Sequence, residues 1–266
     1  MAELLRQPRA PARRMSSAAT EGRPFAAPAL LLIAVAGGCW AVTVERMQGM
    51  DMGPGTNLGG LGWFAVVWVT MMAAMMLPSL SPMAVASSRA TGGGRHWSTA
   101  STVLFAAAYL MPWSAFGALA YVVVEGMRAL DVGVLAWGRG GQYVAGGVLL
   151  GAALYELTAA KGRCLRHCRD PRLLRRRRGA AGALIMGVEQ GGFCLGCSGA
   201  LMAALFALVV MSIAWMLAIA LLVAVEKLLP WTVITLGATA AALALLGLAV
   251  MVVPEHVPWL TIPMSM

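Results

Sequence analysis

The stretch GLGWFAVVWVTMMAAMMLPSL, residues 60–80, decides the fold of this protein. It contains no charged residue, and a helix of about 20 mostly apolar residues is long enough to cross the hydrocarbon core of a bilayer. The whole chain has the same character. Of its 266 residues, 60% are hydrophobic and 12% charged, against about 45–50% and about 25% in soluble domains. A water-soluble fold could not cover that much apolar surface, so the sequence predicts an integral membrane protein.

Several other segments have the length and apolar composition of a membrane span. We therefore predict an all-α transmembrane bundle of about seven spans: 25–45, 60–80, 99–124, 140–160, 183–210, 213–229 and 231–253. The fifth and sixth spans are separated only by a tight turn at about 210–213, and one long tilted helix there would leave six spans. Three regions follow: a disordered cytoplasmic tail (1–24), a single transmembrane domain (25–253) and a short external tail (254–266).

Basic residues are concentrated in two short segments. The predicted cytoplasmic loop 161–178, KGRCLRHCRDPRLLRRRR, holds nine Lys or Arg against one Asp, and the first 24 residues hold five Arg against two Glu. Loops on the cytoplasmic side carry an excess of Lys and Arg. A cytoplasmic amino terminus places 17 of the 20 basic residues on that side, so we predict a multipass plasma (inner) membrane protein in this orientation. Charge confined to membrane flanks also argues against nucleic-acid binding.

Methionines gather within and just before the opening stretch, where seven of the 19 lie between residues 47 and 76. In the sequence MMAAMM, Met71 and Met75 are one helical turn apart, as are Met72 and Met76, so their thioethers form two neighbouring stripes. Soft thioethers and thiolates favour Cu(I) over other available metals. Met72, Met75 and Met76 are therefore candidate ligands, although methionine is also an ordinary filler of hydrophobic cores.

Five cysteines occur in the chain: Cys39, Cys164, Cys168, Cys194 and Cys197. This odd number does not resemble a secreted disulfide framework. Cys194 and Cys197 form a C-x2-C unit, whose spacing lets both sulfurs meet one ion, or each other as a disulfide. Cys164, His167 and Cys168 in the basic loop form a possible loading site, or a basic anchor that happens to contain cysteines.

Carboxylates at membrane depth need a cation, a cavity or a proton, because an isolated charge is costly there. Glu156, Glu189 and Glu226 are therefore candidate site residues, although Glu226 also fits an interfacial position. With a rise of 1.5 Å per residue, Met75, Cys197, Glu156 and Glu226 fall at about the same depth in four predicted spans. For Glu156 we expect charge compensation near a soft ion, since hard oxygen is a poor Cu(I) ligand.

Four motifs occur in a fixed order: WVTMMAAMMLPS (68–79), YELTAAKGRCLRHCRDP (155–171), CLGCSGALM (194–202) and VEKLLP (225–230). Together they resemble a bacterial family of uncharacterised multipass proteins described as predicted metal-binding integral membrane proteins. The resemblance covers about residues 25–250. It implies metal binding, with copper handling suggested, and its presumed metal positions fall on Met72, Met75, Met76, Cys194 and Cys197.

This chain departs from the pattern of that family at several positions. Many members continue the cysteine pair with a third cysteine and a tryptophan, where this chain has Ser198 and Gly199. Many also have a histidine in place of Gln190 and a glutamine in place of Glu156. The resemblance therefore implies fewer strong ligands in this chain.

The sequence predicts an integral membrane protein that binds a soft metal, Cu(I), for metal handling, delivery or transport. Its expected metal residues are Met72, Met75, Met76, Cys194, Cys197 and Glu156, and its expected partners are the lipid bilayer and a copper ion. The sequence shows no ATP-binding loop and no phosphorylatable aspartate motif, so we expect neither a pump nor an enzyme. Two alternatives remain open: an intramembrane thiol–disulfide relay through Cys194 and Cys197, and a structural membrane scaffold in which these residues only pack.

Overall fold

The protein is all-helical over the residues that its computed structural model describes, which are 23–47, 59–92, 95–129, 140–207, 213–229 and 232–253. These residues contain eight α-helices and no strand. Apart from two residues at the start of the first helix, the predicted tails 1–24 and 254–266 lie outside them. The helices are α1 (Arg23–Met47), α2 (Leu61–Thr91), α3 (Arg95–Ala129), α4 (Gly141–Glu156), α5 (Ala159–Arg169), α6 (Gly179–Ala207), α7 (Ile213–Leu228) and α8 (Thr232–Val252).

Five helical segments in this part of the chain are long and apolar enough to cross a membrane: Ala27–Arg46, Leu61–Thr91, Ser98–Gly126, Gly179–Leu205 and Val233–Val252. A sixth arises if α4 and α5, which meet at a bend of 69°, count as one broken span. The predicted number of about seven spans is therefore not confirmed. The predicted span 213–229 is not among these segments, because the corresponding helix α7 is apolar but has only 16 residues. The predicted turn at 210–213 falls largely outside the described residues.

The first half of the predicted cytoplasmic loop 161–178 is helical. Residues 161–169 belong to the helix α5, which begins at Ala159 with Thr158 as its N-cap. The Thr158 hydroxyl accepts a hydrogen bond from the Lys161 backbone N–H at 3.3 Å, as N-cap side chains commonly do. Hydropathy missed this helix because it is short and mostly polar.

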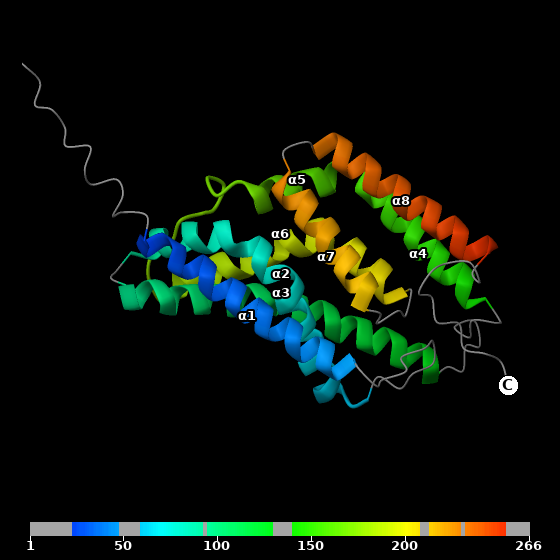
Figure 1. The fold of residues 1–266 in the computed structure, drawn as a ribbon, viewed down its shortest axis with the longest axis horizontal. Coiled ribbons are helices and arrows are strands. Elements are labelled where there is room, and N and C mark those ends of the chain that lie inside the picture. Colours follow the sequence, from blue (N-terminus) through cyan, green and yellow to red (C-terminus); the bar gives the residue numbers. More distant parts are fainter. Residues whose placement is uncertain are drawn as a thin grey trace, which may run out of the picture.

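Close helix contacts are made at glycines. On α6, a Cβ added to Gly187 would lie 2.7 Å from the Ala108 Cβ of α3. On α4, a Cβ added to Gly146 would lie 2.8 Å from the Gly247 carbonyl oxygen of α8. Small residues let helix backbones approach in this way. In Figure 1, α4 and α8 accordingly run side by side along one flank, apart from α1, α2 and α3.

The helix α2 is the core element of the bundle. Every residue from Met71 to Leu77 is buried, so the helix is enclosed on all sides at this level. One turn earlier, the Trp68 indole N–H donates to the Trp113 carbonyl of α3 at 2.8 Å. The outer faces of other helices are apolar and open, as at Leu154 (70% exposed) and Leu245 (69% exposed). Such surfaces are compatible with lipid.

Candidate metal centre

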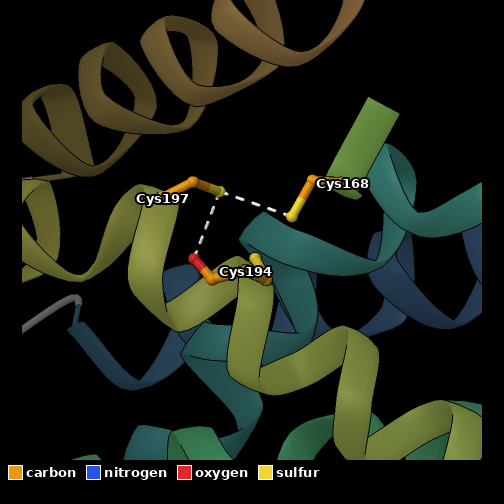
Figure 2. Close-up of side chains that lie close together, drawn as sticks. All are labelled: Cys168, Cys194 and Cys197. Carbon is orange, nitrogen blue, oxygen red and sulfur yellow. Dashed lines mark hydrogen bonds between the residues drawn. The ribbon is translucent and has the colours of Figure 1, made fainter. Parts of the chain in front are cut away.

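Three cysteines meet inside the bundle, as Figure 2 shows. Cys194 and Cys197 come from α6, Cys168 comes from α5, and their sulfurs all lie within 4.8 Å of one another. The Cys197 Sγ lies 3.5 Å from the Cys168 Sγ. At 1%, 1% and 7% exposure respectively, Cys194, Cys197 and Cys168 are buried. This cluster is the group of potential metal ligands found among the described residues, and we call it the thiol cluster.

The local sequence explains how the thiol cluster forms. Residues three apart on a helix share one face, which turns Cys194 and Cys197 of α6 in the same direction. Between them Gly196 has no side chain, and a Cβ there would lie 2.7 Å from the Cys164 Sγ of α5. The Tyr155 hydroxyl also donates to the Gly196 carbonyl at 2.5 Å. The missing side chain lets α5 pack closely against α6, and the bond from Tyr155 fixes the end of α4, just before α5, to α6. Both bring Cys168 within reach of the cysteine pair.

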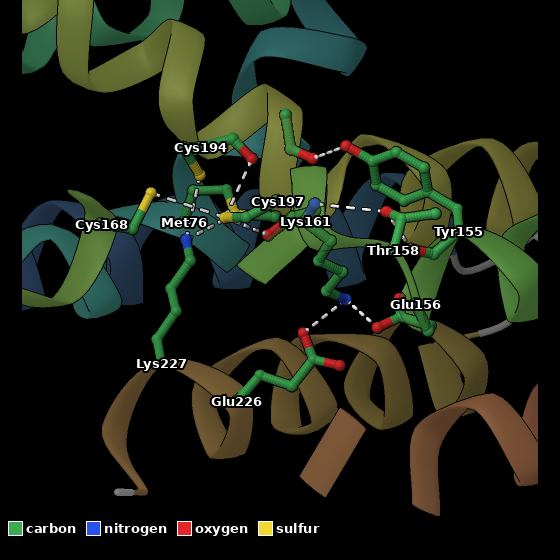
Figure 3. Close-up of polar contacts among 12 residues, drawn as sticks. Met76, Tyr155, Glu156, Thr158, Lys161, Cys168, Cys194, Cys197, Glu226 and Lys227 are labelled. Carbon is green, nitrogen blue, oxygen red and sulfur yellow. Dashed lines mark hydrogen bonds and ion pairs between the residues drawn. The ribbon is translucent and has the colours of Figure 1, made fainter. Parts of the chain in front are cut away.

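Two hydrogen-bond donors point at the sulfur of Cys194. The Tyr109 hydroxyl donates to the Cys194 Sγ at 2.9 Å, and the Lys227 ammonium donates to it at 3.0 Å. The same ammonium donates to the Ser79 hydroxyl at 3.2 Å and lies 3.8 Å from the Met76 Sδ. Figure 3 shows Lys227 reaching from α7 toward Cys194 and Met76. Lys227 therefore links α7 to the thiol cluster and to the methionine stretch.

The predicted methionine ligands occupy different environments. Met76 faces Lys227 and, through it, the thiol cluster. Met72 (0% exposed) and Met75 (4% exposed) are buried in the hydrophobic core. Sequence spacing alone treats all three as equivalent, whereas the contact with Lys227 sets Met76 apart.

Glu156 and Glu226 meet at one lysine rather than among the sulfurs. The Lys161 ammonium forms ion pairs with a carboxylate oxygen of each, with a distance of 2.8 Å to Glu226. All three residues are at most 1% exposed. We call them the buried ion triad, and it lies beside the thiol cluster in Figure 3. With all three groups ionised its net charge is −1. The third candidate carboxylate, Glu189, instead pairs with Arg177 at 3.5 Å in a more exposed position.

Sequence reasoning missed several members of the centre. It placed Cys168 in a separate loading site with Cys164 and His167, but the structure brings Cys168 to the C-x2-C pair. The His167 ring instead stacks on Phe193, with ring centroids 4.3 Å apart. Lys161, Lys227 and Tyr109 were not singled out either. Lys161 and Cys168 are seven residues, or two helical turns, apart. This spacing puts both on one face of a helix, and it was the signal in the sequence that could have linked them.

The arrangement suits a soft cation. Thiolate sulfurs select Cu(I), zinc or iron–sulfur clusters among biological metals. Three buried thiols with a thioether close by form a soft and dry site. Because cysteine must lose its proton to bind a metal, the two donors on the Cys194 Sγ favour the anionic sulfur that a metal needs.

Comparison with known proteins gives one family. A family model described as PpoB2, copper chaperone, matches residues 65–250, which include α3 to α7 and most of α2 and α8. No curated protein matches the chain, and no solved structure does.

Proposed function

The chain belongs to the PpoB2 copper chaperone family, and from this premise we propose that it is a membrane protein that binds Cu(I) and passes it on. The main support for this proposal is the thiol cluster of Cys168, Cys194 and Cys197. The copper ion is cargo in this proposal. The chain's part is to hold it between soft ligands and to release it to an acceptor.

The proposed location is the plasma membrane, with the amino terminus in the cytoplasm. Five to six apolar helices support the membrane part of this proposal. The orientation rests on the positive-inside rule. Cys168 lies in the last turn of α5, beside Arg166 and Arg169, so this orientation places the thiol cluster toward the cytoplasmic side. Copper would then be loaded or released through the end of the bundle that carries the basic residues.

A thiol–disulfide relay is the second candidate function, and one observation favours it. The Cys197 Sγ and the Cys168 Sγ lie 3.5 Å apart, and these two thiols come from different helices. The pair best placed to exchange electrons is therefore Cys168 with Cys197, rather than the C-x2-C pair itself. A relay gives no role to Met76, whereas a soft-metal site uses its thioether. We therefore favour copper binding over the thiol–disulfide relay.

Copper loading of the purified protein tests the proposed function. We expect the protein in detergent, loaded with Cu(I) under reducing and oxygen-free conditions, to retain one ion per chain after gel filtration. The ion should protect Cys168, Cys194 and Cys197 from a thiol-alkylating reagent, measured by mass spectrometry of the peptides. Cys39, which is partly buried on α1 and outside the thiol cluster, serves as the internal control and should be alkylated equally with and without copper. A disulfide between Cys168 and Cys197 in cells, with no copper retained, would favour the relay instead.

The two methionines Met76 and Met72 make a matched pair for a second test. Both are fully buried on α2, with 0% exposure, so replacing either by leucine changes packing by a similar amount. We expect Met76→Leu to lower Cu(I) affinity by about three- to ten-fold and Met72→Leu to leave it within about two-fold, which in free energy is a difference of up to about 1.4 kcal/mol. Competition with a chromophoric Cu(I) chelator measures both. Equal effects of the two substitutions would remove Met76 from the site.

A further inference from the structure

The side chain of Lys227 places a cation within the helical bundle, where its ammonium contacts soft or neutral atoms. Its ammonium contacts the Cys194 Sγ, the Ser79 hydroxyl and the Met76 Sδ. The carboxylate next to it in the chain, Glu226, pairs instead with Lys161. An ionised group at membrane depth requires a partner, and the group closest to this ammonium, at 3.0 Å, is the Cys194 sulfur. The thiol cluster is therefore the negative partner of Lys227.

The net charge of the metal-loaded thiol cluster determines how strongly the Lys227 ammonium stabilises it. Three thiolates around Cu(I) carry a net charge of −2, whereas three thiolates around Zn²⁺ carry −1. A fixed positive charge a few ångströms away attracts the copper-loaded centre about twice as strongly as the zinc-loaded one, because Coulomb energy scales with the product of the charges. In a site from which water is excluded, solvent screens this difference weakly.

We propose that Lys227 determines the specificity of the metal site, making the thiol cluster prefer monovalent copper to divalent zinc. This inference rests on the proposed function, because it assumes that a metal binds at the thiol cluster. Lys227 is not itself a metal ligand. It donates to the Cys194 sulfur from outside and compensates the excess negative charge of the copper-loaded site. Partners that contact ligands from outside in this way change metal affinity by about 10- to 100-fold in other proteins.

Three variants separate the charge of Lys227 from its packing. Lys227→Leu removes the charge and the capacity to donate, and it adds no new metal ligand. Lys227→Arg keeps the charge and the capacity to donate. Ser79→Ala removes another hydrogen-bond partner of the ammonium and changes no charge, so it is the control for local rearrangement. Cu(I) and Zn²⁺ affinities are measured for each purified protein by competition with chromophoric chelators, and the thermal midpoint of each metal-free protein reports whether the fold is retained.

We expect Lys227→Leu to lower Cu(I) affinity by about ten-fold or more and to leave Zn²⁺ affinity within about three-fold, so that the preference for copper falls. Lys227→Arg and Ser79→Ala should keep most of that preference. Unchanged or higher Cu(I) affinity in Lys227→Leu would overturn the inference, since the ammonium would then be irrelevant or a competitor of the ion. An equal loss for both metals, or an equal loss of preference in Ser79→Ala, would also overturn it.

The failure of this inference and the failure of the proposed function can be told apart. If the wild-type chain retains no copper, the proposed function fails and the inference fails with it. If the wild-type chain retains copper and Lys227→Leu binds it with unchanged preference, the copper site stands and only the role of Lys227 is wrong. Should Lys227→Leu not fold, Lys227→Arg still decides: a preference for copper that is kept supports the inference, and one that is lost in a folded Lys227→Arg overturns it.

Discussion

Replacing Cys194 by serine is expected to lower Cu(I) affinity by a factor on the order of 100, or about 2.7 kcal/mol of binding free energy. The substitution exchanges a soft sulfur for a hard oxygen, which is a poor Cu(I) ligand. Cys194 is the sulfur on which the centre converges, since Tyr109 and Lys227 both donate to it. Serine nearly preserves the size of the side chain, so the fold should be retained. Competition with a Cu(I) chelator measures the loss.

Two other cysteines provide matched controls for this substitution. Cys39 lies on α1 and Cys164 on α5, and both are partly buried and outside the thiol cluster. Changing either to serine removes one thiol from the protein, as Cys194→Ser does, but should leave Cu(I) affinity within about three-fold. If Cys39→Ser were as harmful as Cys194→Ser, the loss would come from general destabilisation. If Cys194→Ser bound copper normally while Glu156→Gln did not, a carboxylate-centred site would replace the thiol cluster.

The helical class of the fold could be predicted from the sequence, because long apolar stretches such as 60–80 are detected by composition alone. The number of spans could not. Residues 213–229 are apolar enough to be counted as a span, but α7 ends after 16 residues at Leu228. The bend between α4 and α5 lies at Leu157 and Thr158, where neither proline nor glycine marks a break. Hydropathy therefore extends the fourth span across a turn of 69°.

The candidate site was predictable where it depends on local spacing and unpredictable where it depends on the path of the chain. The spacing of Cys194 and Cys197 indicates a shared helix face without any tertiary information. The addition of Cys168 depends on the bend before α5 and on the missing side chain of Gly196. The depth estimate placed Glu156 and Glu226 at one level, and the structure brings both to Lys161. Lys161 joins them, but nothing in the sequence sets it apart from the other basic residues of 161–178.

The buried ion triad leads to the largest expected effect on stability. Replacing Lys161 by methionine leaves the carboxylates of Glu156 and Glu226 facing each other without a cation, at 0% and 1% exposure. Breaking a buried ion pair by removing one partner costs about 3–5 kcal/mol, because an uncompensated charge remains in a dry interior. We expect Lys161→Met to lower the free energy of unfolding in detergent by at least this amount. Denaturation followed by circular dichroism measures it.

Neutral variants of the triad test whether charge is the cause. Combining Lys161→Met with Glu156→Gln and Glu226→Gln removes every charge, and it should recover most of the lost stability, since a buried ion pair is often no more stabilising than neutral groups of similar volume. Glu156→Gln alone leaves the neutral pair of Lys161 and Glu226, so we expect a folded protein whose copper retention is weakened but not abolished. If Lys161→Met were as stable as the wild type, the two carboxyl groups would have to be uncharged in the folded variant, and an uncompensated buried charge would not be the cause of any loss of stability.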